Sequence, residues 1–186
     1  ALSDGLGDLR VAGIATNREW LLAAVRTPAF QRGEATTRFV ADHAEHLQAT
    51  PAPDDADLAL AAVAWVESHA PRETRVSPWT AYDAFRPNLP ALQRIRLAAG
   101  EVAVDVDVER MADGWAVRFG ERLHEVRWAP VSPGASAAGG VADATLGGRR
   151  SRVEWRRDGL SLRLWRGARV VDVAIVGAGP AGIALG

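Results

Sequence analysis

Residues 102–128 read VAVDVDVERMADGWAVRFGERLHEVRW, and this stretch decides the fold. Valines alternate with Ala103 and with acidic residues, which is the period of a strand with one buried and one solvated face. Asp113-Gly114 and Gly120-Glu121 supply turns into two further alternating strands. The residues expected on the buried faces are Val102, Val104, Val106, Val108, Trp115, Val117, Phe119, His124, Val126 and Trp128. The pattern predicts an antiparallel meander.

The strand pattern resumes after a long loop, rich in Pro, Ser, Ala and Gly, that is expected over residues 129–140. The strands expected beyond it cover residues 141–146, 153–155, 160–164 and 170–176, with turns at Gly147-Gly148, Asp158-Gly159 and Arg166-Gly167. Short antiparallel strands need closure or cover to protect their edges, so we expect a small barrel. The tryptophans expected to fill it are Trp65, Trp115, Trp128, Trp155 and Trp165.

Helical patterns precede the strands. Residues 16–19 have the form of a capping box with Thr16 as the N-cap, which predicts a helix that stops near Pro28. A second helix is expected from residue 36 or 37 to residue 47, and the Pro-rich stretch 50–53 predicts a domain boundary.

The next segment, residues 56–70, is apolar nearly all round, with Asp54 and Asp55 as candidate N-caps. Such a helix needs to be enclosed, and the barrel that follows offers an interior. We therefore expect an α+β fold: a short helical segment, followed by a small antiparallel β-barrel around a long apolar helix.

Composition excludes several kinds of chemistry. All 22 cationic residues are arginine, so the chain has no lysine for a Walker-type phosphate loop, a Schiff base or the attachment of biotin. A net charge of −1 provides no field that would attract nucleic acid or an anionic membrane, and neither partner is expected. The absence of cysteine and of a spanning apolar run favours the cytoplasm. Because the first residue is Ala1 and the one methionine is Met111, we expect a fragment.

A glycine fingerprint follows the last expected strand, at Gly177, Gly179 and Gly182. Flavoproteins use this spacing to place a pyrophosphate at a helix N-terminus, which would imply FAD. The sequence given stops at Gly186, without the helix, second strand and acidic residue that such a site needs. Three interpretations stay open: a chance or chimeric tail, a flexible linker, and the start of a truncated FAD-dependent oxidoreductase domain.

Other candidate sites have simpler structural interpretations. His43 and His46, beside Asp42 and Glu45, have a helical spacing that fits a metal, but no further ligand cluster supports one. A structural role is likewise expected for the isolated His69 and His124, for the strand carboxylates and for a basic run with one aromatic: Asp105, Asp107, Glu109, Arg149, Arg150, Arg152, Trp155, Arg156 and Arg157. No catalytic residue and no metal ligand is therefore expected.

Two groups of motifs resemble the α subunits of biotin-dependent acyl-CoA carboxylases of the methylcrotonyl-, propionyl- or acetyl-CoA type. The first resembles the end of a biotin carboxylase domain and comprises Leu9–Asn17, Trp20-Leu21, Pro28–Phe30, Gly33-Glu34 and Thr37–Val40. The second comprises Pro78-Trp79 and Phe85–Asn88, followed by the strand-rich remainder, and resembles the BT domain, a β-barrel around a long helix.

The resemblance implies three regions: residues 1–49 as the truncated end of the biotin carboxylase domain, 50–176 as a BT-like docking domain, and 177–186 as an unmatched Gly-rich tail. It implies a parent that carboxylates biotin with ATP, Mg and bicarbonate. Its partners would be a carboxyltransferase β subunit and other α subunits in a hetero-oligomer. The resemblance also implies that the catalytic residues of the family lie outside this chain.

Overall fold

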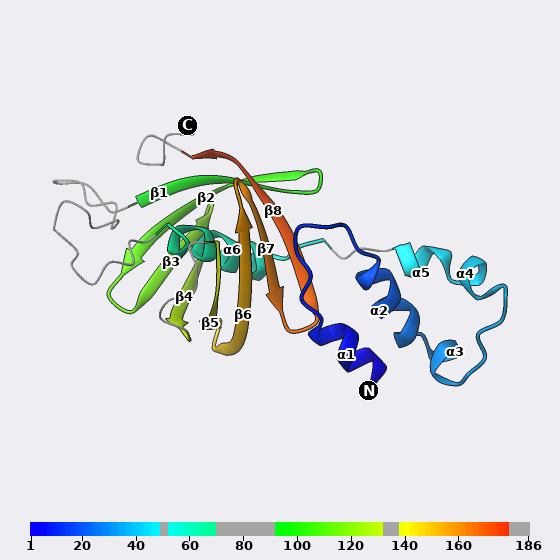
Figure 1. Cartoon of the computed structure of the whole chain (residues 1–186). Helices are drawn as coiled ribbons and strands as arrows, with labels where there is room; N and C mark the ends of the chain where they lie inside the picture. The colour runs from blue at the N-terminus through cyan, green and yellow to red at the C-terminus, as the bar shows by residue number, and fades with distance from the viewer. Residues whose placement is uncertain (49–51, 70–91, 132–137, 179–186) are drawn as a thin grey trace. The chain divides into compact units, whose positions relative to one another are not determined.

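The computed structural model describes residues 1–48, 52–69, 92–131 and 138–178. The chain divides into two compact units. One comprises Ala1–Ala52 with Gly167–Arg169, and the other comprises Pro53–Arg166 with Val170–Gly186. Figure 1 shows the elements of both units, and each is described here by itself.

The first unit is helical in its described part. Its helices are α1 (Leu2–Asp8), α2 (Arg18–Arg26), α3 (Pro28–Gln31), α4 (Phe39–Asp42) and α5 (Ala44–Gln48). Ala24 of α2, Phe39 of α4 and Leu47 of α5 form a small buried cluster, against which Trp20, Ala23 and Ala29 pack. Each of these helices is short and buries little apolar surface, so the cluster is small.

The prediction that Thr16 is the N-cap of the helix now seen as α2 was wrong. Asn17 is the N-cap of α2, and no side chain makes a capping hydrogen bond there. The predicted stop before Pro28 is confirmed, since α2 ends at Arg26 and the next residue is extended. That residue, Thr27, instead caps α3 by accepting a hydrogen bond from the Phe30 N–H.

The continuous helix expected up to residue 47 was also wrong. The chain leaves the helical region at His43, with φ −120° and ψ 17°, and this break separates α4 from α5. The His43 N–H donates to the Phe39 carbonyl, and its Nδ1 lies 3.0 Å from the same oxygen. The backbone amide and the side chain of His43 therefore both lie against the Phe39 carbonyl at the C-terminal end of α4.

The second unit contains eight strands that form one closed barrel in sequence order. They are β1 (Leu92–Ala99), β2 (Val102–Met111), β3 (Gly114–Phe119), β4 (Arg122–Pro130), β5 (Gly139–Leu146), β6 (Arg149–Asp158), β7 (Ser161–Arg166) and β8 (Arg169–Ala178). The pairings of β1 with β2 and with β8 are both antiparallel, and the second of these closes the barrel. The predicted meander and small barrel are confirmed.

The sequence analysis missed β1 altogether. Its burial alternates, with Ile95, Leu97 and Ala99 buried and Arg94 and Arg96 exposed. The predicted loop over 129–140 is shorter in the structure, because β4 continues to Pro130 and β5 begins at Gly139.

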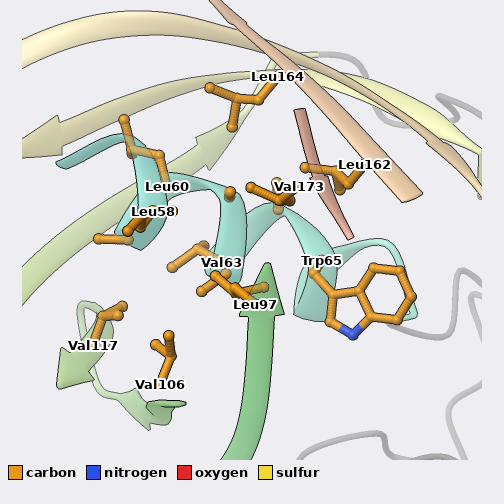
Figure 2. Close-up of a cluster of buried hydrophobic side chains, with 14 of the residues drawn as sticks. Leu58, Leu60, Val63, Trp65, Leu97, Val106, Val117, Leu162, Leu164 and Val173 are labelled. Atoms are coloured by element: carbon orange, nitrogen blue, oxygen red, sulfur yellow. The ribbon is translucent and has the colours of Figure 1, made fainter. Parts of the chain in front are cut away.

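The apolar helix expected near residues 56–70 is α6 (Asp55–Glu67), with Asp54 as its N-cap. Ten of its 13 residues are buried, from Asp57 to Val66 without interruption. The apolar ones join the inward-facing residues of the strands in one hydrophobic cluster, which Figure 2 shows for Leu60, Val63 and their neighbours. A helix that is apolar all round needs such contacts on every side.

The tryptophan prediction holds for most of the set. Trp65, Trp115 and Trp155 belong to this cluster, and Trp128 packs against it. Trp165 is a correction: it is 5% exposed but lies outside the cluster. Leu162 and Leu164 of β7 face the core, so the alternation of the strand directs Trp165 to the opposite face.

Candidate functional site at the two ends of the barrel

The strands run alternately in opposite directions, so their termini form two ends of the barrel. At one end lies the β3–β4 turn, together with the acidic residues that start α6: Asp54, Asp55 and Asp57. We call it the aspartate end. The opposite end has the β2–β3 and β6–β7 turns and carries four indoles: Trp65, Trp115, Trp128 and Trp155. We call it the tryptophan end.

At the aspartate end, a capping box starts α6. The Asp57 N–H donates to Asp54 Oδ1 at 2.7 Å, and the Asp54 N–H donates to Asp57 Oδ2 at 3.2 Å. Arg166 at the end of β7 places Nη2 2.7 Å from Asp57 Oδ1, and the Asp57 side chain is fully buried. The carboxylates lie at the positive end of the helix dipole and are neutralised by a strand arginine.

A second tether at this end joins α6 to β4. Arg122 forms an ion pair with the Asp55 carboxylate, and His124 Nε2 lies 3.6 Å from Asp55 Oδ2. The acidic first turn of α6 is thus held by arginines from two different strands.

At the tryptophan end, Glu67 is the acceptor that connects the last turn of α6 to β2 and β3. Arg110 Nη1 donates to Glu67 Oε1 at 3.1 Å, and the Trp115 indole N–H donates to the same oxygen at 3.0 Å. The Arg110 guanidinium also lies 4.6 Å from the centre of the Trp115 ring. A cation–π contact of this kind adds to the charge-assisted hydrogen bonds.

His69 follows α6 and connects it to β6. Its Nδ1 lies 2.8 Å from the Trp65 carbonyl, its ring centre lies 4.5 Å from that of Trp65, and Arg157 Nη1 donates to its Nε2. Nδ1 therefore carries the proton and donates to the carbonyl, and the imidazole is neutral. Burial lowers the pKa of His69, and the Arg157 charge lowers it further, against the hydrogen bond to Trp65, which raises it.

Trp128 and Trp155 form a tilted pair at this end, with ring centres 5.3 Å apart. Gly140 makes room for it, because a Cβ there would lie 2.5 Å from the Trp155 ring. Both indole nitrogens are buried, and neither finds an acceptor in the part of the chain that the structure describes. A buried donor without a partner is uncommon and costs free energy.

The carboxylates of β2 lie on the outer face of the barrel, as predicted. Asp107 pairs with Arg94 at 2.7 Å and Asp105 with Arg96 at 3.9 Å, and both arginines are on β1. Glu109 is also on this face and partly buried. These are cross-strand ion pairs on a solvated surface, and they bring no pair of carboxylates together for acid–base chemistry.

The basic run on β6 does not form a surface for stacking bases. Trp155 is 6% exposed and points into the core, while Arg150 and Arg152 lie 2.7 and 3.7 Å from Asp143 on β5. Arg157 donates a hydrogen bond to His69 Nε2. Arg149 and Arg156 are exposed.

No metal site is formed by the described residues, where no three His, Cys, Asp or Glu side chains come together. His43 lies between α4 and α5 and stacks on Phe39 with ring centres 4.7 Å apart, and His46 lies in α5. The break at His43 removes the helical spacing on which a two-histidine site would depend.

The FAD alternative has no support. Gly177 lies within β8, paired with Arg96 of β1 in an antiparallel barrel, whereas the fingerprint requires a parallel sheet and a following helix. Gly179 and Gly182 lie outside the described residues, as do Pro78-Trp79 and Phe85–Asn88 of the second family motif.

The tethers at both ends were missed by the sequence analysis. Glu67, Arg110, Arg122, Arg157 and Arg166 carry no motif, and each matters because of the strand end at which it lies. A usable signal was present: arginines at strand ends next to a helix with acidic residues at both of its ends.

Fold and tethers together define a domain in which a helix and a closed barrel share one core. Residues 53–177 match the family model described as the BT domain of the methylcrotonyl-CoA carboxylase α subunit. The mitochondrial methylcrotonoyl-CoA carboxylase subunit alpha of Dictyostelium discoideum is 30% identical over 130 residues. This alignment covers 67% of the chain and 19% of the relative's length. The chain belongs to this family: it contains the BT domain of a biotin-dependent carboxylase α subunit.

Proposed function

We propose that this chain docks the biotin carboxylase component of an acyl-CoA carboxylase α subunit to the carboxyltransferase β subunit. The observation that carries the proposal is the match of the barrel and α6 to the BT family over residues 53–177. The site geometry is consistent with it, since the polar groups at both ends of α6 tether the helix to strands. The described residues form no cluster of His, Cys, Asp or Glu that could hold a metal.

We further propose that α6 is the helix that the BT barrel encloses. In support, its middle residues from Ala59 to Ala64 are 0–1% exposed, and both of its ends are tethered to strand termini. Residues 1–49 would be the end of the biotin carboxylase domain, residues 50–176 the docking domain, and residues 177–186 a Gly-rich tail.

The parent would carboxylate biotin with ATP, Mg and bicarbonate and would assemble with β subunits and other α subunits. The chain spans about a fifth of the relative it matches, so this activity is a proposal for the whole α subunit. Biotin is not held here, because attachment needs a lysine and the chain has none.

The expected cytoplasmic location stays a prediction, since the relative is described as mitochondrial. Among the described residues, no helix has the length and apolar character needed to cross a bilayer.

The test is the affinity of the intact α subunit for the purified β subunit, measured with and without Leu60→Ala in α6. Leu60 is 1% exposed, so its truncation leaves a core cavity and destabilises the barrel by about 2–5 kcal/mol. We expect wild-type binding to be saturable and the variant to bind more weakly. ATP-dependent carboxylation of free biotin should persist in the variant. Absence of wild-type binding would overturn the proposal.

A further inference from the structure

We infer that Arg18 anchors the β7–β8 turn within the helical first unit, as a positioning residue that keeps this hairpin from opening. The turn residues Gly167–Arg169 belong to the first unit, although the strand residues on both sides of them belong to the second. The chain therefore passes between the units at this turn as well as at residues 52–53, where the Pro-rich stretch predicted a boundary. The inference goes beyond docking and needs no β subunit for its test.

Arg18 is a buried cation in α2. It is 3% exposed, and its Nη1 lies 2.9 Å from Glu19 Oε1, which balances the charge. Its Nε finds no acceptor among the described residues, so the two Nη groups make all of its hydrogen bonds. Burying a guanidinium costs free energy unless its donors are paired, so these hydrogen bonds determine where the side chain lies.

The Nη groups connect two backbone carbonyls that are far apart in the sequence. Nη2 donates to the Gly7 carbonyl at 2.7 Å, and Nη1 and Nη2 lie 3.3 and 3.4 Å from the Ala168 carbonyl. Gly7 lies in the last turn of α1, where carbonyls lack partners within the helix, and Ala168 lies between β7 and β8. The planar guanidinium presents several donors in a fixed geometry, so one side chain can serve both carbonyls.

Two further contacts hold the same turn. A Cβ at Gly7 would lie 3.3 Å from the Ala168 Cβ, so α1 and the turn approach each other closely. Arg169 Nη2 donates to the Ala52 carbonyl at 2.8 Å. The turn is thus held from three places in the first unit, and Arg18 supplies the buried charged group.

Local opening of a hairpin exposes its backbone amides, and its free energy is set by the contacts that must break. For the β7–β8 turn these contacts include the hydrogen bonds from Arg18 to Ala168. When the Nη donors are lost, the Gly7 carbonyl keeps a donor in Arg10 Nη1 at 2.8 Å, whereas Ala168 loses both contacts with the guanidinium. The loss therefore falls on the turn.

The test is hydrogen exchange in the full-length protein, followed by mass spectrometry over a peptide that covers Gly167–Arg169. Arg18→Met removes the donors and keeps a long side chain in the buried site, and Arg26→Met makes the same change at an exposed position of α2. We expect Arg18→Met to speed exchange at the turn by about tenfold or more and Arg26→Met by about twofold or less. Equal exchange at the turn in both variants, or acceleration confined to α1 and α2, would overturn the inference.

A second pair of variants decides the question if Arg18→Met does not fold. Gly7→Ala and Gly5→Ala raise the helix propensity of α1 by similar amounts. The new Cβ meets Ala168 at position 7, whereas at position 5 no described atom outside the helix lies within 4 Å of it. We expect exchange at the turn to be about two- to fivefold faster in Gly7→Ala than in Gly5→Ala. Equal or slower exchange in Gly7→Ala would show that the turn is not held against α1, and the inference would fail.

Discussion

At the residue scale, His69 makes the stability of the second unit depend on pH. The folded state keeps its imidazole neutral between the Trp65 carbonyl and Arg157, so its pKa lies below the ordinary value of 6.5. Its contribution is complete above pH 6.5 and is lost as the pH falls towards the lowered pKa, because the unfolded state takes up the proton first.

We therefore expect the melting temperature to fall more between pH 7.5 and pH 5 in the wild type than in His69→Gln, as measured by circular dichroism. The carboxylates and the other histidines titrate in both proteins, so the difference between the two curves isolates His69. Parallel curves would show that His69 has no such role.

Gly140 is the second residue-scale case. A Cβ there would lie 2.5 Å from the Trp155 ring, which is held in the core and cannot move aside at low cost. Gly140→Ala should destabilise the protein to denaturant by about 1–3 kcal/mol. Gly177→Ala is the matched control, since Gly177 also lies in a barrel strand and its Cβ would meet only Arg96 at 3.8 Å. Equal unfolding midpoints for the two variants would contradict the claim that Gly140 is needed to make room for the Trp155 ring.

At the scale of the element, α6 depends on its acidic first turn. Asp57 combines the capping box with the buried contact to Arg166, so Asp57→Ala removes both and leaves the arginine with only the exposed Asp54 carboxylate. We expect a loss of about 2–4 kcal/mol in the free energy of unfolding, measured with urea. Asp42→Ala, a change in an exposed carboxylate of α4, should cost under about 0.5 kcal/mol.

The elements show what the sequence alone can predict. The period of the valines predicted β2 and its neighbours, and the apolar run predicted α6, because both signals repeat over many residues. The strand β1 was missed because its alternation is short: Arg94 and Arg96 alternate with Ile95 and Leu97, and two alanines follow. The break at His43 is accompanied by a contact between its side chain and the Phe39 carbonyl. The periodicity of apolar residues does not predict such a contact.

At the scale of the whole molecule, the order of the elements predicted a barrel with a helix before it. Arginines at strand ends and acidic residues at both ends of α6 indicated that tethers could form, but the sequence could not predict which residues pair, because that depends on which strand termini meet each end of α6. The unpaired indole N–H groups were hidden for the same reason. Tryptophans in an apolar pattern are predicted to lie in the core, and only the structure shows that Trp128 and Trp155 find no acceptor among the described residues.

The central claim is that this barrel joins the two catalytic components of a carboxylase. The most direct measurement is a cryo-electron microscopy structure of the intact α subunit bound to the β subunit. We predict that the barrel lies at the interface and contacts the β subunit. A complex in which the β subunit contacts no residue of 53–177 would contradict the claim.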